Sequence, residues 1–370
     1  MKLLMCFGTR PEAIKMAPLY IYLKESANID LKLCVTAQHR EMLDQVLDFF
    51  DIKPDYDLSL MQKNQSLNRL CSRILDKIDD VLTEFNPDYV LVHGDTSTSS
   101  MVALGAFHRG IKIAHIEAGL RTYNKLSPFP EEINRQITGR LSDLHFAPTK
   151  WAAENLLNEG ISEENIVVTG NTVIDALKLG LSKIDGDYSS DNLNLVKGIL
   201  KPELRTILIT GHRRENFGQG FENLCMAIKQ VAESHSDVQI IYPVHLNPNV
   251  MEPVNRILSN ISNVHLITPL DYPAFIYLMS QSYIILTDSG GVQEEAPSLG
   301  KPVLVMRNNT ERPEAVEAGT VKLVGTEIES IVSACNTLLE DASAYEKMSL
   351  AHNPYGDGQA CKRILERFSL

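Results

Sequence analysis

Leu3-Leu4-Met5-Cys6-Phe7-Gly8-Thr9-Arg10-Pro11-Glu12 is an apolar run that leads into a glycine and then into a helix start. The first five residues are all apolar, which is typical of a parallel strand covered on both faces. Gly8 permits a tight turn, and Pro11 suits the first turn of a helix. The segment therefore predicts a strand, a short turn and a helix, as expected at the beginning of an α/β fold.

The same pattern recurs along the chain. Short runs rich in Val and Ile alternate with longer helical patterns, and they fall into two sets. The first set continues with Leu31–Ala37, Tyr89–His93, Lys112–Ile116, His145–Ala147 and Ile166–Thr169, and the second comprises Thr206–Thr210, Val238–Val244, Val264–Ile267, Tyr283–Thr287, Pro302–Met306 and Val321–Val324. Two successive sets of strand–helix units predict an α/β protein with two doubly wound, Rossmann-like domains.

The predicted domain boundary lies in a polar stretch between the two sets. Ser182–Asn194 is rich in Asp, Ser, Gly and Asn, so the junction is expected between residues 170 and 200. We assign residues 1–170 to the first domain and residues 171–352 to the second. Residues 353–370 contain a short amphipathic helix. Two α/β halves of similar size predict a ligand cleft between them.

Composition excludes several classes of protein. The 370 residues contain 35 Lys and Arg against 47 Asp and Glu, a formal net charge of −12, which disfavours nucleic-acid binding through a broad basic surface. The six Cys form no C-x-x-C pair, so we expect reduced, mostly buried thiols. No apolar run approaches the ~18 residues of a membrane span, and we expect a cytoplasmic protein without a membrane partner.

Two glycine-containing turns are candidate anion sites. The turn at Gly8 starts a helix whose amides, together with Arg10 and Lys15, could bind an anion. Thr287-Asp288-Ser289-Gly290-Gly291 also joins a strand to a helix, and Ser289 would add a hydroxyl donor for a phosphate. Glu295, one turn into that helix, could accept hydrogen bonds from ribose hydroxyls. An ordinary strand–helix turn and a glycine-rich connector are the alternative interpretations.

Three carboxylates are candidates for acid–base chemistry. Asp95 and Glu117 follow predicted strands, and the carboxyl ends of parallel strands border the ligand site. Glu131 lies in a nearby loop rich in prolines and aromatics. Each acid alone could be a helix cap or a solvated charge, and Asp95 precedes a plausible helix start. Together they favour general acid–base catalysis.

Gly211-His212-Arg213-Arg214-Glu215 follows the first strand of the second domain. A His and two Arg at a strand end suit a diphosphate or a leaving group, although a solvated basic turn is the alternative. The chain has no G-x-G-x-x-G after a strand, no Walker A sequence and no H-E-x-x-H. We therefore expect neither a nucleotide cofactor nor a metal.

Several of these motifs together resemble the non-hydrolysing UDP-N-acetylglucosamine 2-epimerases, and the resemblance spans essentially the whole chain. The matching segments are Phe7–Pro18, Thr36–Arg40, His93–Thr96, Ile116–Arg121, Pro130–Arg135, Gly211–Glu215, Asp288–Glu295, Arg312–Glu314 and Asn353–Gly358. The chain is most similar to the enterobacterial type, which supplies UDP-N-acetylmannosamine for surface polysaccharides such as enterobacterial common antigen.

The resemblance implies a glycosyltransferase-B-like fold with UDP in the interdomain cleft, a C-terminal helix that packs back on the first domain, no cofactor and a homodimer. The residues implied for substrate binding are Arg10, Lys15, Asp95, Glu117, His212, Phe275, Ser289, Gly290, Gly291, Glu295 and Arg312. The catalytic candidates are Asp95, Glu117, Glu131 and His212. Phe275 would lie beside the base. Leu270 departs from the family, whose closest members carry Gln there.

The resemblance also implies an allosteric site for a second UDP-N-acetylglucosamine. Gln38, Arg213 and His245 match the residues associated with that site. Glu41 and Asn64 stand where relatives carry Gln and Arg. Asn in place of Arg removes a cation that could pair with the effector diphosphate, and Glu in place of Gln adds a negative charge that repels it. Activation is therefore expected to persist with weaker affinity for the effector.

The implied reaction is reversible epimerisation at C2 of the sugar. Departure of UDP from C1 acidifies the C2 proton, a carboxylate removes it, and the product of this elimination is a 2-acetamidoglucal. Protonation from the other face and return of UDP then give the manno epimer. A hydrolysing 2-epimerase, a glycosyltransferase of the same fold and a non-catalytic UDP-sugar sensor remain the alternatives.

Overall fold

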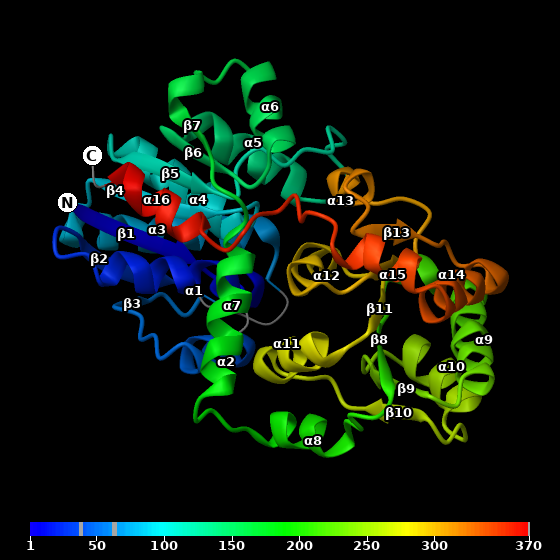
Figure 1. The fold of residues 1–370 in the computed structure, drawn as a ribbon. Helices are drawn as coiled ribbons and strands as arrows, with labels where there is room; N and C mark the ends of the chain where they lie inside the picture. Colours follow the sequence, from blue (N-terminus) through cyan, green and yellow to red (C-terminus); the bar gives the residue numbers. More distant parts are fainter. Residues whose placement is uncertain (37–39, 61–64, 369–370) are drawn as a thin grey trace. The chain divides into compact units, whose positions relative to one another are not determined.

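A computed structural model describes residues 1–36, 40–60 and 65–368 of the chain. It divides into two compact units (Figure 1), unit 1 with Met1–Leu179 and Tyr355–Leu370, and unit 2 with Gly180–Pro354. Each unit is a parallel α/β structure with its own sheet. These observations confirm the two doubly wound domains expected from the sequence.

Unit 1 contains a parallel sheet in the order β3-β2-β1-β4-β5-β6-β7. Its strands are β1 (Lys2–Phe7), β2 (Asp30–Val35), β3 (Tyr56–Asp57), β4 (Tyr89–His93), β5 (Lys112–Ile116), β6 (Leu144–Ala147) and β7 (Ile166–Val168). The strands predicted from the sequence begin and end within two residues of those observed. Sequence reasoning missed β3, because two residues, one of them an aspartate, give no apolar run.

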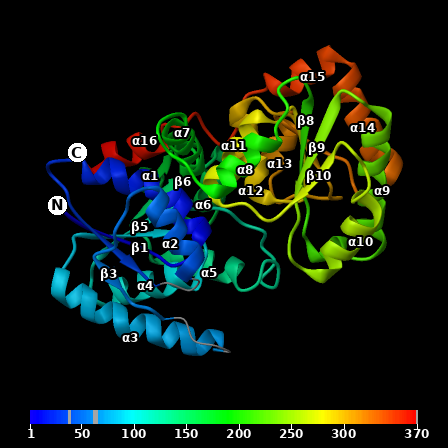
Figure 2. The same cartoon turned by 90° about the horizontal axis from the view of Figure 1, so that it is seen from below.

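Helices cover both faces of the sheet in unit 1. They are α1 (Arg10–Lys24), α2 (Arg40–Phe49), α3 (Leu67–Phe85), α4 (Ser97–His108), α5 (Glu131–Leu141), α6 (Lys150–Asn158), the 3-10 turn η1 (Glu163–Asn165), α7 (Thr172–Asp185, which runs on into unit 2) and α16 (Ala360–Phe368). In Figure 2, α3 and α4 lie on one side of the strands, and α1 and α16 lie on the other. Helix α16 contacts α1, and the Phe368 ring lies 5.5 Å from that of Tyr89.

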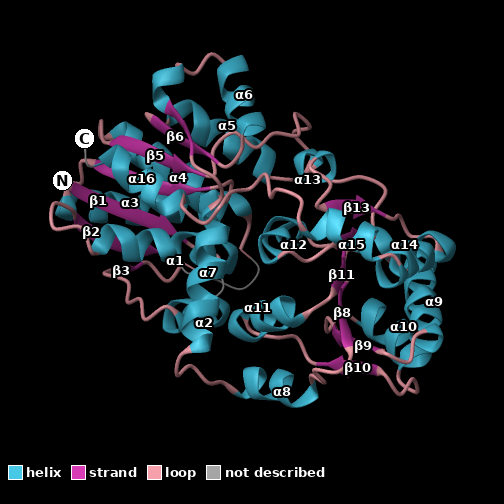
Figure 3. Ribbon diagram, in the orientation of Figure 1, coloured by secondary structure: helices cyan, strands magenta, loops and turns pink. Residues whose placement is uncertain are grey.

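Unit 2 contains a parallel sheet in the order β10-β9-β8-β11-β12-β13 (Figure 3). Its strands are β8 (Arg205–Thr210), β9 (Val238–Pro243), β10 (Val264–Ile267), β11 (Ile284–Thr287), β12 (Val303–Val305) and β13 (Val321–Leu323). The helices are α8 (Asp191–Ile199), η2 (Arg214–Asn216), α9 (Gln219–Ser234), α10 (Pro248–Leu258), α11 (Tyr272–Gln281), α12 (Gly290–Glu295), η3 (Ala296–Leu299), α13 (Pro313–Glu317), α14 (Ile328–Glu340) and α15 (Ala342–Ser349).

Alternation along β1 explains why its sequence is apolar throughout. Leu4 and Cys6 join the core formed with α3 and α4, and the intervening Leu3, Met5 and Phe7 point to the opposite face, where they are also fully buried. The six cysteines are free thiols, and all but Cys71 are buried, as expected. Among the described residues, no helix is long and apolar enough to cross a membrane.

Candidate active site

The strand order of each unit reverses at one place, and the predicted site residues border it. In unit 1 the reversal lies between β1 and β4, which lead into Gly8 and Asp95. In unit 2 it lies between β8 and β11, which lead into the turns that carry the predicted residues His212 and Ser289. Ligands of doubly wound sheets bind beyond the carboxyl ends of the strands at such a switch point. The sequence candidates therefore occupy the expected ligand site of each unit.

The turn after β1 is held by an internal carboxylate. Glu12 Oε2 accepts hydrogen bonds from the backbone amides of Gly8 (3.0 Å) and Thr9 (2.8 Å), and Thr9 caps α1 in return. This capping box therefore uses the amides of the two residues that precede α1. The anion site expected at the start of α1, with Arg10 and Lys15, stays a prediction. Arg10, the first residue of α1, can then contribute to anion binding through its side chain.

Glu12 also reaches the next strand–helix turn. Its Oε1 accepts a hydrogen bond of 2.7 Å from the hydroxyl of Thr96, which caps α4. Burial raises the pKa of Glu12 to about 7, although hydrogen bonds from Thr96, Gly8 and Thr9 oppose that effect. The interpretation of Asp95 as the cap of this helix is wrong, because the Thr96 side chain accepts from Ser99 N–H and performs that role.

Glu117 follows β5 with a backbone φ of 61°, a left-handed conformation that is uncommon outside glycine. Its Oε2 accepts from Lys15 Nζ and from Asn171 Nδ2 (2.8 Å), and His93 Nε2 lies 3.9 Å away. Burial alone would raise the pKa of Glu117, but the charges of Lys15 and His93 and these hydrogen bonds outweigh burial and lower it to about 2. The left-handed backbone and the ion pair with Lys15 together mark Glu117 as a candidate functional residue.

Asp95 pairs with Arg135 of α5. Burial raises the pKa of Asp95; Arg135 opposes that shift, and the charges of Glu117 and Glu131 reinforce it. The structure thus brings Glu117 and Glu131 close enough to Asp95 for their charges to act on it. Glu131 is the first residue of α5.

The residue next to Glu131 has a structural role. Glu132 is buried, and its carboxylate accepts hydrogen bonds from the backbone amides of Thr122 and Tyr123, both at 3.0 Å. It therefore fixes the loop that precedes α5 and is not a candidate for proton transfer. Of the two adjacent glutamates, only Glu131 was predicted to be catalytic.

In unit 2, His212 follows β8 and stacks on His245, with ring centroids 5.2 Å apart and planes 14° apart. Asp288 Oδ2 accepts hydrogen bonds from the backbone amides of His212 and Arg213, each 2.8 Å long. Arg213 NH1 lies 3.7 Å from Glu311 Oε1. The structure thus brings His212, Arg213 and His245 together at one end of the sheet. Gln38, the third predicted effector residue, lies outside the described residues.

The predicted phosphate loop begins α12. Arg312 lies across Gly290, where an added Cβ would stand 2.5 Å from its NH1, so only glycine permits this approach. Arg312 Nε and NH2 each lie 2.7 Å from Glu294 Oε1, and Glu294 is buried. Ser289 N–H donates to Thr287 Oγ1 (2.9 Å). This arrangement presents a cation beside the glycine backbone.

Two further predicted residues lie in α12, and a third lies in α11. Glu295 ends α12 and is buried, Gly291 lies within that helix, and Phe275 is a half-buried residue of α11. Leu270, where relatives carry Gln, is buried one residue before Asp271, which caps α11.

Sequence reasoning did not assign roles to several partners of these residues. They are Glu12, His93, Arg135, Asn171, Asp288 and Glu294. Most of them lie inside the motifs quoted above. Those motifs indicated the regions of the site but did not show which side chains contact one another. Asn171 lies outside them, and its position directly after a strand and Gly170 was its one signal.

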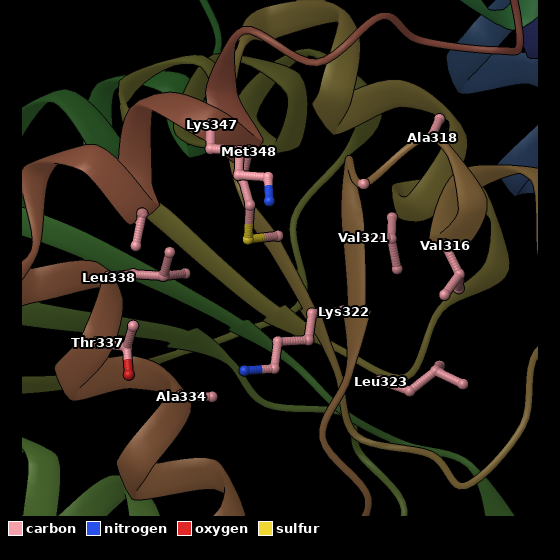
Figure 4. Close-up of a pocket in the computed structure, with 12 residues that line it drawn as sticks. Val316, Ala318, Val321, Lys322, Leu323, Ala334, Thr337, Leu338, Lys347 and Met348 are labelled. Atoms are coloured by element: carbon pink, nitrogen blue, oxygen red, sulfur yellow. The ribbon is translucent and has the colours of Figure 1, made fainter.

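A separate cavity of about 550 Å³ lies at the β13 edge of unit 2 (Figure 4). Its lining is mostly apolar, with Val321, Leu338 and Met348 pointing inward beside Lys322. None of the predicted site residues lines this cavity. Among the described residues, no group of three or more His, Cys, Asp or Glu could hold a metal ion.

Fold and site define an α/β enzyme with two doubly wound units and two carboxylates, Glu117 and Glu131, whose charges act on Asp95. The family model for UDP-N-acetylglucosamine 2-epimerase matches residues 22–369. The chain is 57% identical to the UDP-N-acetylglucosamine 2-epimerase of Escherichia coli K12 over 370 residues, covering 99% of this chain and 98% of that protein. It is 58% identical to a probable UDP-N-acetylglucosamine 2-epimerase of Ralstonia solanacearum over 365 residues, covering 98% and 97% of the two chains.

Solved structures give the same result. The Neisseria meningitidis UDP-GlcNAc 2-epimerase bound to UDP-GlcNAc matches with a TM-score of 0.91 and 52% identity, and the match covers 100% of both chains. The Methanocaldococcus jannaschii enzyme in complex with UDP-GlcNAc and UDP matches with a TM-score of 0.80 and 34% identity, over 100% of this chain and 99% of that one. The chain therefore belongs to the non-hydrolysing UDP-N-acetylglucosamine 2-epimerases, which are isomerases.

Proposed function

We propose that the chain interconverts UDP-N-acetylglucosamine and UDP-N-acetylmannosamine by elimination and re-addition of UDP. The observation that carries this proposal is the group of three carboxylates in unit 1, in which the charges of Glu117 and Glu131 act on Asp95. The bound UDP-GlcNAc in the Neisseria meningitidis relative supports the choice of substrate.

Elimination breaks two bonds of the sugar and forms one. UDP leaves C1 with the electron pair of the C1–O bond, a carboxylate takes the C2 proton, and a C1=C2 double bond forms. Addition of a proton at the other face of C2 and return of UDP to C1 complete the epimerisation. General acid–base groups must hold and release this proton, and Glu117 and Glu131 are the proposed groups, with Asp95 assisting.

The ion pair between Glu117 and Lys15 must weaken before Glu117 can act as a base in this mechanism. A carboxylate with a pKa of about 2 is a weak base, and Lys15 is one main cause of that low value. We infer that the sugar draws Lys15 away from Glu117 when it binds, which raises the basicity of the carboxylate. Asp95, whose pKa is already raised by burial, is suited to exchange a proton with its neighbours.

We assign the proposed UDP-binding role to Arg10 in unit 1 and to several residues in unit 2. Arg10, His212, Arg312, the hydroxyl of Ser289 and the backbone amides of Gly290 and Gly291 would stabilise the negative charge of departing UDP, a preorganised electrostatic effect. Glu295 would accept hydrogen bonds from the ribose, and Phe275 would lie beside the uracil. The contact of Arg312 with the Gly290 backbone supports a phosphate at this place, because both present donors to one anion.

The test is purified protein with UDP-N-acetylglucosamine in deuterium oxide, followed by proton NMR. We expect solvent deuterium at C2 of both epimers and small amounts of UDP and 2-acetamidoglucal. Full retention of the C2 proton would contradict the elimination mechanism. Free N-acetylmannosamine would identify a hydrolysing enzyme, a requirement for an acceptor would identify a transferase, and binding without turnover would identify a sensor.

We also propose effector control through Arg213 and His245. His245 stacks on His212, so an effector that contacts His245 would influence a residue of the UDP site. The reverse reaction, started from pure UDP-N-acetylmannosamine, should show a lag that traces of UDP-N-acetylglucosamine abolish. Immediate hyperbolic turnover would show that this control is absent.

The wider setting is proposed from the family resemblance. The product would supply the synthesis of a bacterial surface polysaccharide, in the cytoplasm, and the enzyme would act as a homodimer. Sedimentation of the purified protein tests the dimer. Deletion of the gene, followed by analysis of N-acetylmannosamine in surface polysaccharide, tests the biosynthetic role.

A further inference from the structure

Asp288 is a completely buried acid at the end of β11, beside His212. Its Oδ2 accepts hydrogen bonds of 2.8 Å from the backbone amides of His212 and Arg213. These two hydrogen bonds fix the backbone of the turn after β8. They use only one of the two carboxylate oxygens.

The other oxygen, Oδ1, is also buried, and among the described residues it has no hydrogen-bond partner. A buried charged oxygen without a donor is costly, so such an atom in a native site calls for a partner. His212 Nδ1 lies 3.7 Å away, which is beyond a hydrogen bond but within reach of a small ring rotation. The His212 side chain is 49% exposed and so has room for this movement.

We propose that Asp288 is a positioning residue for His212, because its Oδ1 accepts the Nδ1–H of the ring and directs Nε2–H toward the leaving diphosphate. The proposal rests on the proposed function, in which His212 contacts UDP. Catalytic hydrogen bonds in ligand-free structures are often long and shorten when substrate binds. The stack on His245 restricts the plane of the ring and leaves Nδ1 on the side of Asp288.

The hydrogen bond to Asp288 affects the charge that His212 presents to UDP. With Nδ1–H bound to Asp288, the ring can present an Nε2–H donor only in its doubly protonated, cationic form. A cationic ring whose Nδ1–H is bound to the buried carboxylate stabilises the negative charge that develops on UDP as the C1–O bond breaks. No proton transfer from His212 is required, because a charge-assisted hydrogen bond to the phosphate is sufficient.

Asp288→Asn separates the two roles of the carboxylate. The amide oxygen of Asn can still accept the backbone amides of His212 and Arg213, so the turn should keep its shape. The amide nitrogen would then face His212 Nδ1 and donate to it, which reverses the polarity of the contact and favours a neutral ring protonated at Nε2. A purely structural role for Asp288 predicts no change in the ring.

The first readout is nitrogen-15 NMR of the ligand-free protein at about pH 8.5, where an ordinary histidine is neutral. The His212 signals are identified by their absence in His212→Asn. In the unaltered protein we expect Nδ1 to carry a proton, and in Asp288→Asn we expect Nδ1 to be unprotonated. An unprotonated Nδ1 in the unaltered protein overturns the proposal, and this measurement does not depend on turnover.

The second readout is kinetic. Asp288→Asn should lower kcat roughly 10- to 100-fold, less than the 10²–10³-fold loss on removal of a direct donor, while the Kd for UDP changes less than about threefold. In a His212→Asn background the same substitution should have almost no further effect on kcat. An equal loss of kcat in both backgrounds would overturn the proposal.

Asp237→Asn, which removes an exposed acid paired with Arg205, is the matched control and should leave kcat unchanged. A separate result would show that the proposed function is wrong. If the unaltered protein does not convert UDP-N-acetylglucosamine, the proposed function is wrong, while the NMR measurement still decides whether Asp288 orients His212.

Discussion

The Oε1 atom of Glu12 accepts a hydrogen bond of 2.7 Å from the hydroxyl of Thr96, and one buried carboxylate thereby joins the start of α1 to the start of α4. These two helix starts carry Arg10 and Asp95. Helix N-termini are positively polarised, so two of them stabilise the ionised Glu12 against the cost of its burial. The pKa of about 7 shows that burial still has the larger effect.

The raised pKa of Glu12 predicts a pH-dependent stability. The pKa rises from 4.5 to about 7 on folding, so the folded chain holds this proton more tightly than the unfolded chain. The resulting stabilisation is complete below pH 4.5 and is lost as the pH rises through 7. Its size is on the order of 3 kcal/mol, since one pKa unit corresponds to about 1.4 kcal/mol.

Glu12→Gln removes this titration. The free energy of unfolding of the unaltered protein, minus that of the variant, should therefore fall between pH 4.5 and pH 7.5, as measured by urea unfolding at several pH values. Glu154→Gln, at an exposed position of α6, should give a difference that is flat over this range. A flat difference for Glu12→Gln as well would contradict the assigned pKa.

Glu117→Gln and Glu131→Gln should each lower kcat far more than they weaken UDP binding. General acid–base groups contribute about 10²–10⁴-fold in rate. Calorimetry with UDP gives the binding constant, and turnover at saturating substrate gives kcat. Normal turnover by Glu117→Gln together with a loss of UDP binding would mean that the roles are assigned the wrong way round.

Lys15→Met should move the acid limb of the pH–rate profile. Lys15 lowers the pKa of Glu117, so without its charge the burial of Glu117 dominates and the pKa rises. A base must be ionised to act, and the variant should therefore lose kcat/KM at a higher pH than the unaltered enzyme does. The profile is measured between pH 4 and pH 9, with Lys24→Met at the other end of α1 as the control. Superimposable profiles would exclude Glu117 as the titrating base.

Arg10→Ala and Glu295→Ala should mainly weaken UDP binding. In the proposed function Arg10 binds the diphosphate and Glu295 binds the ribose, and both contacts would form before the chemical step. The loss should therefore appear in the Kd for UDP measured by calorimetry, with a smaller change in kcat at saturating substrate. A large fall in kcat at unchanged Kd would assign these residues to the chemical step.

Much of the secondary structure could be predicted because buried parallel strands leave a plain pattern. Tyr89–His93 and Lys112–Ile116 are apolar or nearly so throughout, and the structure has them with the predicted bounds. The first helical turn was also marked, by Gly8 and Pro11. The two-residue strand β3 left no such pattern, because its pairing with Cys34 and Val35 depends on β2 and not on its own sequence.

Apolar runs and turn residues act over a few neighbouring positions, and they therefore predict the two α/β sheets and the strand ends at which the site residues lie. Which side chains meet depends on contacts between segments that are distant in the chain. Lys15 and Glu117 are 102 residues apart in the chain, and Asp288 and the His212 amide are 76 apart. Their contacts, and the pKa values that follow from them, depend on burial and on charges that the fold brings within a few ångströms.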